Sequence, residues 1–128
     1  MKAYKKLFRG RLGRWHYFLG NFIILFIAGI IAILYPDIQL SILFPLLISI
    51  LTLPIIVRRL HDIDISGFIA PVSLLGYFSR DLFLVMVIAG FSLVLLFKKG
   101  SKDANKYGEA PKPGLKFLNA ILNKETTK

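Results

Sequence analysis

The sequence of 128 residues contains no cysteine, and its acidic residues are few, 7 Asp and Glu against 17 Lys and Arg. A chain without cysteine forms neither disulfides nor thiolate metal sites. It has only 2 histidines, His16 and His61, and its carboxylates are scattered. Because a His-Asp metal site needs several such ligands together, we expect no metal and no other cofactor.

The usual signatures of catalysis are missing as well. The sequence has no glycine-rich phosphate loop, no Ser-x-x-Lys in a strand–helix context and no pair of carboxylates within an apolar segment. Such groups supply nucleophiles, proton transfer or phosphate binding in enzymes. We therefore predict a protein that is not an enzyme and has no catalytic residues.

Long apolar stretches dominate what is present, and hydrophobic residues make up 55% of the chain. Residues 41–57 carry no charge, and residues 67–97 carry only Arg80 and Asp81. Between these stretches lies a central charged segment, residues 58–66. Because hydrocarbon tolerates charge poorly, this segment must lie at a membrane surface or in a protected cavity. The pattern predicts a polytopic membrane protein.

Two of the apolar segments are long. Residues 17–35 would span about 28 Å as a helix, close to the thickness of a bilayer core. This segment is too long for the core of a signal peptide, and no small-residue cleavage site follows it, so we expect it to be retained. In residues 41–57, Pro45 and Pro54 predict bends.

Two further segments are short. Residues 67–79 and 82–97 would span about 20 Å and 24 Å as helices. We interpret them as two short crossings, with a re-entrant hairpin as the alternative. The predicted fold class is all-α: a bundle of four transmembrane helices in a membrane domain of residues 1–112, with an amphipathic tail of residues 113–128.

Both ends of the chain are expected to lie along the membrane surface. In residues 113–128, apolar side chains recur at helical spacing between lysines, which predicts an interfacial helix. Residues 1–8 favour a short basic surface helix in the same way.

The basic residues indicate an orientation. Six Lys and Arg fall in residues 1–16, two in 58–65 and eight after Phe97, but only Arg80 falls in a turn on the opposite side. The positive-inside tendency makes the basic side cytoplasmic, with both termini inside. The net charge of +10 is also typical of nucleic-acid binding. Because the charges flank apolar segments, we expect anionic lipid and no nucleic acid.

Three motifs occur in order along the chain. They are Phe8-x-Gly10-Arg11-x-x-Arg14-x-x-Tyr17-Phe18, Arg58-Arg59-Leu60-His61-Asp62 followed by Ser66-Gly67-Phe68, and Gly100-x-x-x-x-Asn105-x-Tyr107-Gly108-x-x-Pro111. With these motifs the chain resembles the bacterial inner-membrane family called domain of unknown function 805. It departs from the family pattern at Asp64, Ile65 and Ala110. The resemblance implies a small multi-pass protein of the bacterial inner membrane, with no established activity.

The central charged segment allows ion pairs along a helix. Arg58 and Arg59 stand four and three residues before Asp62, so either arginine can pair with that carboxylate. One interpretation is a helix end whose cations complement the helix dipole. The other is a polar site in which arginines hold a phosphate or carboxylate. We predict a structural polar network of Asp62, Ser66 and Asn105.

The candidate binding site combines all three motifs. We predict that they converge on one cytoplasmic site for an anion or lipid headgroup, formed by Arg11, Arg14, Arg58, Arg59, His61 and Tyr107. The alternative for Arg11 and Arg14 is a membrane anchor beside neighbouring aromatic residues. The alternative for Tyr107 is a tight loop without further function.

Three functions remain open. The first is a non-enzymatic inner-membrane protein whose arginine-rich cytoplasmic face binds membrane lipids. The second is a subunit of an oligomeric channel or small-solute transporter, assembled through the faces of Gly29, Gly76 and Gly90. The third is a scaffold or regulator that recruits an unidentified protein partner.

Overall fold

The computed structural model describes residues 7–112, and the expected interfacial helices of residues 1–8 and 113–128 lie largely or wholly outside them. Within the described residues the chain is helical and has no β-strand, so the predicted all-α class is confirmed. The elements in chain order are α2 (Arg14–Leu34), the 3-10 turn η1 (Pro36–Leu40), α3 (Leu43–Asp62), the 3-10 turn η2 (Gly67–Ile69), α4 (Ala70–Phe78) and α5 (Leu82–Phe97).

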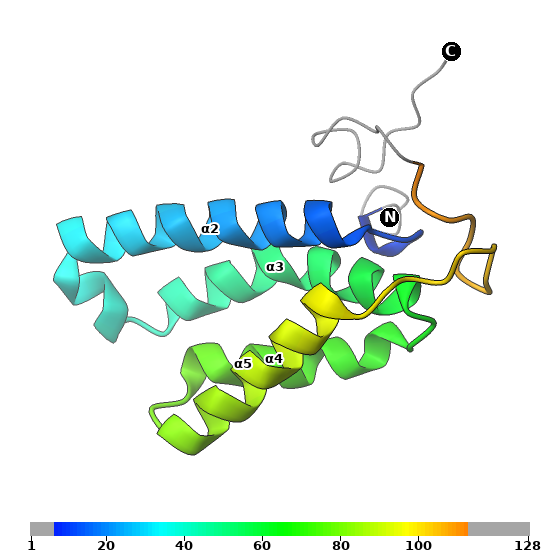
Figure 1. Cartoon of the computed structure of the whole chain (residues 1–128). Helices are drawn as coiled ribbons and strands as arrows, with labels where there is room; N and C mark the ends of the chain where they lie inside the picture. Colours follow the sequence, from blue (N-terminus) through cyan, green and yellow to red (C-terminus); the bar gives the residue numbers. More distant parts are fainter. Residues whose placement is uncertain (1–6, 113–128) are drawn as a thin grey trace, which may run out of the picture.

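The helices α2 and α3 form an antiparallel pair (Figure 1). Both are long and apolar enough, by length and composition, to cross a membrane. Much of α2 is covered by large apolar side chains that stay exposed, such as Phe22, Phe26 and Ile33. An exposed apolar surface of this kind fits lipid better than water, which suggests a membrane protein.

The helix α3 continues through the charged residues to Asp62. Pro45 lies in its first turn, where the missing N–H of proline costs little, and Pro54 lies in its interior. Arg58, Arg59 and Asp62 therefore occupy the last turns of one helix. Within the central charged segment, residues 58–62 are therefore α-helical, and residues 63–66 form the turn that follows.

The helices α4 and α5 are shorter, with 9 and 16 residues. The charged pair at their junction separates them: Asp81 accepts a hydrogen bond from the backbone N–H of Leu84 at 2.8 Å and so caps the start of α5. That these two segments cross the bilayer stays a prediction, as does the re-entrant alternative.

The polar side chains inside the helices bond to their own helix. The amide of Asn21 donates to the carbonyl of Tyr17 at 2.9 Å, and the hydroxyl of Ser92 donates to the carbonyl of Ile88 at 3.0 Å. Ser49 and Thr52 do the same four residues back along α3. Each of these side chains therefore has a hydrogen-bond partner within its own helix.

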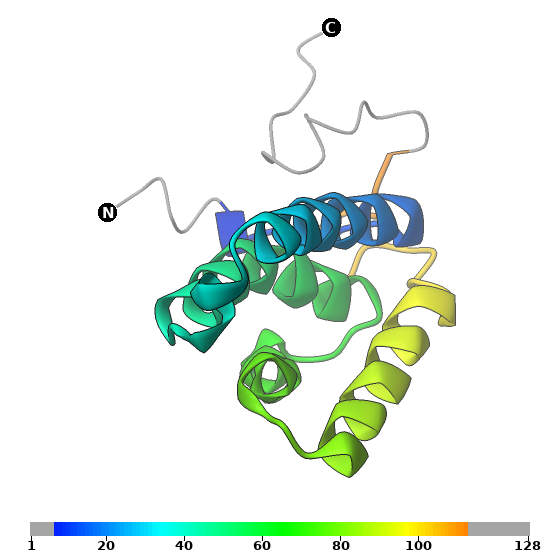
Figure 2. The same ribbon diagram turned by 90° about the vertical axis from the view of Figure 1, so that its left-hand side faces the viewer.

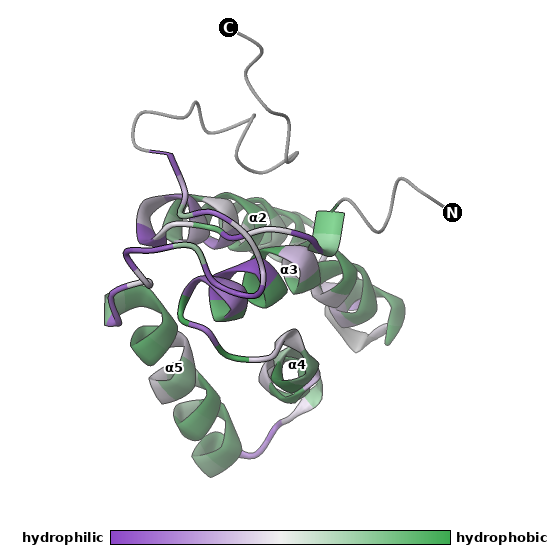
Figure 3. Cartoon of the chain, turned by 90° about the vertical axis from the view of Figure 1, so that its right-hand side faces the viewer, coloured by the Kyte–Doolittle hydropathy of each residue, from purple (hydrophilic) through white to green (hydrophobic). Residues whose placement is uncertain are grey.

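All four helices meet at one end of the bundle, where the buried core lies. The core residues include Leu12, Tyr17, Ile56, Leu60 and Leu95. The start of α2, the ends of α3 and α5 and the segment 98–112 gather there, and hydrophilic residues concentrate at this end (Figure 3). We call it the basic end, formed by residues 9–14, 58–62 and 98–112.

Candidate functional site

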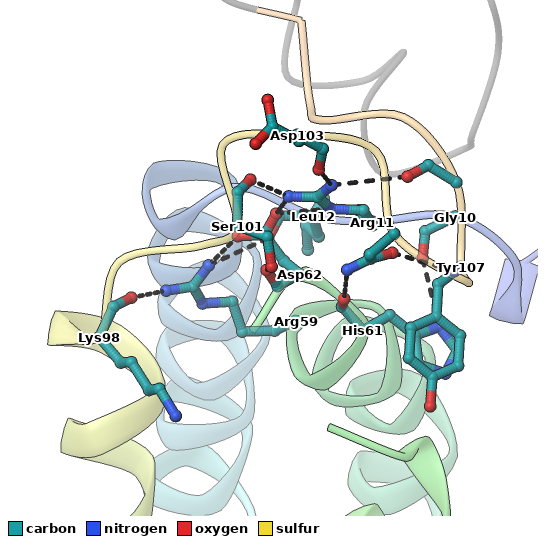
Figure 4. Close-up of polar contacts among 12 residues, drawn as sticks. Gly10, Arg11, Leu12, Arg59, His61, Asp62, Lys98, Ser101, Asp103 and Tyr107 are labelled. Carbon is teal, nitrogen blue, oxygen red and sulfur yellow. Dashed lines mark hydrogen bonds and ion pairs between the residues drawn. The ribbon is translucent and has the colours of Figure 1, made fainter. Parts of the chain in front are cut away.

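The centre of the basic end is the carboxylate of Asp62, whose side chain is only 4% exposed. Its Oδ1 accepts a hydrogen bond from Nε of Arg11 at 3.1 Å, and its Oδ2 accepts one from Nη1 of Arg59 (Figure 4). Both arginine side chains are fully buried. We call Arg11, Arg59 and Asp62 the Asp62 clamp. Two guanidinium groups on one carboxylate leave the clamp with one net positive charge.

The other donors of the two arginines reach backbone carbonyls. Arg11 donates through Nη1 to the carbonyl of Asp103 at 2.7 Å and through Nη2 to the carbonyl of Ser101. Arg59 donates through Nε to the carbonyl of Leu95 at 2.7 Å and through Nη2 to that of Lys98. The last carbonyls of a helix lack partners within it. Arg59 thus caps the end of α5, while Arg11 holds the loop that follows.

Backbone hydrogen bonds complete the junction. The N–H of Leu12 donates to the carbonyl of Arg58 at 3.0 Å, and the N–H of Ser101 donates to the carbonyl of Asp62 at 2.8 Å. The segment before α2, the end of α3 and the segment after α5 are therefore tied together by main chain as well as side chains. The three sequence motifs form one structural unit.

Two motif glycines leave room for this junction. A Cβ atom at position 67 would lie 2.6 Å from Cγ1 of Val57, and one at position 100 would lie 2.0 Å from Oδ2 of Asp62. Neither distance is compatible with van der Waals contact. Glycine is therefore required where these two segments pass the end of α3.

The third motif lies on the outer side of the same helix end. The rings of His61 and Tyr107 stack, with centroids 3.9 Å apart and planes 7° apart. The amide of Asn105 donates to the carbonyl of His61 at 2.8 Å, while its oxygen accepts from the N–H of Tyr107 at 2.9 Å. Nδ1 of His61 lies 3.3 Å from the carbonyl of Gly10. The loop thereby packs against His61 of the second motif, which in turn contacts Gly10 of the first.

The predicted site residues therefore have different surroundings. Arg11 and Arg59 converge, but on the chain's own carboxylate, and Arg58 is also buried. His61 and Tyr107 stack on each other, and Arg14 is exposed at the start of α2. The structure does not bring these six residues onto one open site.

The predicted polar network divides in a similar way. Asp62 is at its centre, and Asn105 reaches the same helix end through the carbonyl of His61. Ser66 instead accepts a hydrogen bond from the N–H of Phe68 at 3.3 Å and caps η2. Its side chain therefore stabilises the turn between α3 and α4.

An open cleft of about 860 Å³ lies beside the clamp, between the start of α2, the end of α5 and the segment 100–112. Three cationic side chains line it, those of Arg14, Lys102 and Lys112, together with Trp15 and His16. Phe18, Leu96 and Phe97 add apolar surface to its lining, and Asp62 also lines it. Sequence reasoning found only Arg14, because the two lysines are brought to the cleft by the path of a loop.

The donor set of the described residues offers no place for a metal: no group of three or more His, Asp or Glu side chains gathers in residues 7–112. The chemistry available at the basic end is that of guanidinium and ammonium groups beside aromatic rings. Such groups suit a phosphate or carboxylate.

The fold and site define an all-helical protein with two candidate membrane-spanning helices, in which a buried arginine–aspartate clamp joins three polar motifs. Residues 7–109 match the family model described as "Protein of unknown function (DUF805)", and the chain belongs to this family. The resemblance predicted from the three motifs is thus confirmed. No relative among curated proteins and no similar solved structure was found.

Proposed function

We propose that the protein is a non-enzymatic component of the bacterial inner membrane, and that its basic end faces the cytoplasm and binds the headgroup of an anionic lipid. The cleft between α2 and α5 carries this proposal, because both cationic and apolar side chains line it. A lipid headgroup combines the same two properties. The positive-inside bias supports the orientation.

Within the part of the chain that the structure describes, the cations of the cleft are not paired with acidic residues. No carboxylate within residues 7–112 forms an ion pair with Arg14, Lys102 or Lys112. Asp62, the acidic residue in the cleft wall, is already neutralised by Arg11 and Arg59. The field in the cleft is therefore positive, and each basic group near an anionic membrane surface contributes about 1 kcal/mol to attraction.

The aromatic residues of the cleft fit the headgroup region of a bilayer. Trp15 is 65% exposed at the start of α2, and its ring stacks with that of Phe18, with centroids 5.9 Å apart. Tryptophan prefers the headgroup region of membranes. This placement would put the cations of the cleft level with lipid phosphates. The predicted homo-oligomer and protein partner remain predictions.

The experiment compares two double variants that each remove two positive charges from the basic end. Arg14→Gln with Lys102→Gln removes cations of the cleft, whereas Lys99→Gln with Lys106→Gln removes exposed cations outside it. Each protein is purified from nanodiscs that contain phosphatidylglycerol and phosphatidylethanolamine. The lipid that it retains is then measured by native mass spectrometry.

We expect the first double variant to lose about tenfold or more in preference for phosphatidylglycerol, and the control to lose less than about threefold. Equal losses would mean that the basic surface attracts lipid diffusely, and the proposed site would be wrong.

A further inference from the structure

A second cavity, of about 530 Å³, lies between the helices on the side away from the basic end. All four helices line it, with Leu25 from α2, Ile56 from α3, Gly76 from α4 and Val85 from α5 among the lining residues. Its volume falls in the range of ligand-binding sites in proteins. The headgroup cleft does not account for it.

Most polar side chains of this cavity have a hydrogen-bond partner within the chain. Asn21 and Ser92 donate to carbonyls of their own helices, and Ser73 donates to the carbonyl of Ala70 at 2.6 Å. The side chain of Tyr17 interacts with Ser92, and that of Tyr77 with Thr52. A cavity whose hydroxyl groups are paired and whose remaining wall is mostly apolar accepts hydrocarbon more readily than water.

The cavity follows the headgroup cleft along the same two helices. On α2, Arg14 and Phe18 line the cleft, and Asn21 and Leu25 line the cavity. These residues are three or four apart, so they form one continuous helical face.

Along α5 the order is reversed, so that residues lining the cavity come before residues lining the cleft. Val85, Ala89 and Leu93 line the cavity, and Leu96 and Phe97 line the cleft. The two helices diverge away from the basic end (Figures 1 and 2). A molecule whose charged group binds in the cleft can therefore extend into the cavity between the same two helices.

We propose that the ligand is an anionic phospholipid held at two points, with its phosphate in the cleft and one acyl chain in the cavity between α2 and α5. This inference rests on the proposed function and adds that the site selects a chain as well as a charge. Leu25, Val85 and Ala89 are exposed at the cavity, so a chain can enter from the bilayer side. The paired hydroxyl groups disfavour a water-filled path for a solute.

The test uses Ala89→Leu, which fills the cavity, and Gly90→Leu as its control. The two residues are adjacent in α5, but position 90 does not line the cavity, and a Cβ atom there would meet nothing within 4 Å. The full chain has a single tryptophan, Trp15, which lies at the cleft. Its emission is titrated in nonionic detergent with phosphatidylglycerol and, separately, with glycerol 3-phosphate, which has no chain.

For Ala89→Leu we expect affinity for phosphatidylglycerol to fall by at least about fivefold through overpacking, with unchanged binding of glycerol 3-phosphate. Gly90→Leu should behave as the wild type. If both variants bind phosphatidylglycerol equally well, the acyl-chain inference is overturned. The proposed function still stands if Arg14→Gln with Lys102→Gln weakens binding of both ligands. If that double variant binds both ligands as tightly as the wild type, both proposals fail.

A measurement on the wild-type chain removes dependence on how well a variant folds. Phosphatidylglycerol with a diazirine in its acyl chain is photolysed in nanodiscs, and the labelled residues are identified by mass spectrometry. We expect labels on the cavity face, at Leu25, Ala89 and Leu93. Equal labelling of the exposed outer positions Phe22 and Val87 would contradict the inference.

Discussion

Gly100 passes so close to Asp62 that a Cβ atom at position 100 would lie 2.0 Å from the carboxylate oxygen Oδ2. The glycine belongs to the third motif and the aspartate to the second. The carboxylate needs that space because it lies between Arg11 and Arg59. The glycine is therefore a requirement of the clamp.

Replacing Gly100 by alanine should destabilise the protein by about 1–3 kcal/mol, the usual cost of overpacking a filled site. The matched control is Gly90→Ala, inside α5, where an added Cβ meets nothing within 4 Å. That control should be neutral or stabilising by up to about 1 kcal/mol, because alanine favours helix over glycine. Thermal unfolding in detergent measures both, and a Gly100→Ala protein as stable as the control would refute the clamp geometry.

Removing the charge of Asp62 should be severe. Asp62→Asn leaves two buried guanidinium groups without a counter-charge, which costs about 3–5 kcal/mol. Adding Arg59→Gln should recover part of this loss, so the two changes together should cost less than their sum. A double-mutant cycle that pairs Asp62→Asn with Arg80→Gln, in the loop at the far end of α4, should instead be additive. Chemical unfolding of all variants measures the coupling, and additivity for Arg59 would argue against the pair.

The loop that carries Tyr107 should depend on ring stacking with His61. Tyr107→Ala removes the ring, so trypsin should cleave after Lys102 and Lys106 faster than in the wild type, by about threefold or more if stacking is worth about 1 kcal/mol. Tyr107→Phe keeps the ring and should digest at the wild-type rate. Faster cleavage of the phenylalanine variant to the same extent would mean that stacking does not hold the loop.

The absence of native cysteine allows a clean test of topology. Single cysteines at Asp37, Arg80 and Asp103, all exposed in the structure, are treated in intact cells with a membrane-impermeant maleimide. The charge bias predicts labelling at 37 and 80 and none at 103. Protection at 80 would favour the re-entrant hairpin over two crossings. Labelling at 103 would reverse the orientation.

The helices were readable from the sequence because apolar runs and charged interruptions mark them directly. The expected segment 82–97 coincides with α5, and the spacing of Arg59 and Asp62 fits an ion pair one helical turn apart. The local spacing allowed Arg58 equally well as the partner of Asp62. Only the packed structure distinguishes them, since Arg59 faces Leu95 and Asp62 while Arg58 supplies its carbonyl to Leu12.

Contacts between distant motifs were harder to predict. Arg11 and Asp62 are 51 residues apart, and no periodicity relates them. The lysines of the cleft belong to no helix, so their positions depend on how the clamp fixes the 98–112 segment. Gly29 and Gly90 have open space around them, whereas Gly76 packs against Ile88 within the chain. Of the three glycine faces considered for assembly, two are therefore free in the bundle.

The Asp62 clamp uses Arg11 and Arg59 for structure, and we propose that Arg14, Lys102 and Lys112 hold a lipid phosphate. Photolysis of phosphatidylglycerol that carries a diazirine on its headgroup, bound to the wild-type protein in nanodiscs, tests this most directly. We expect labels on residues 14–16, 18, 96–97, 100–102 and 110–112, which line the cleft. Labels spread evenly over the basic end, including His61 and residues 105–107, would contradict it.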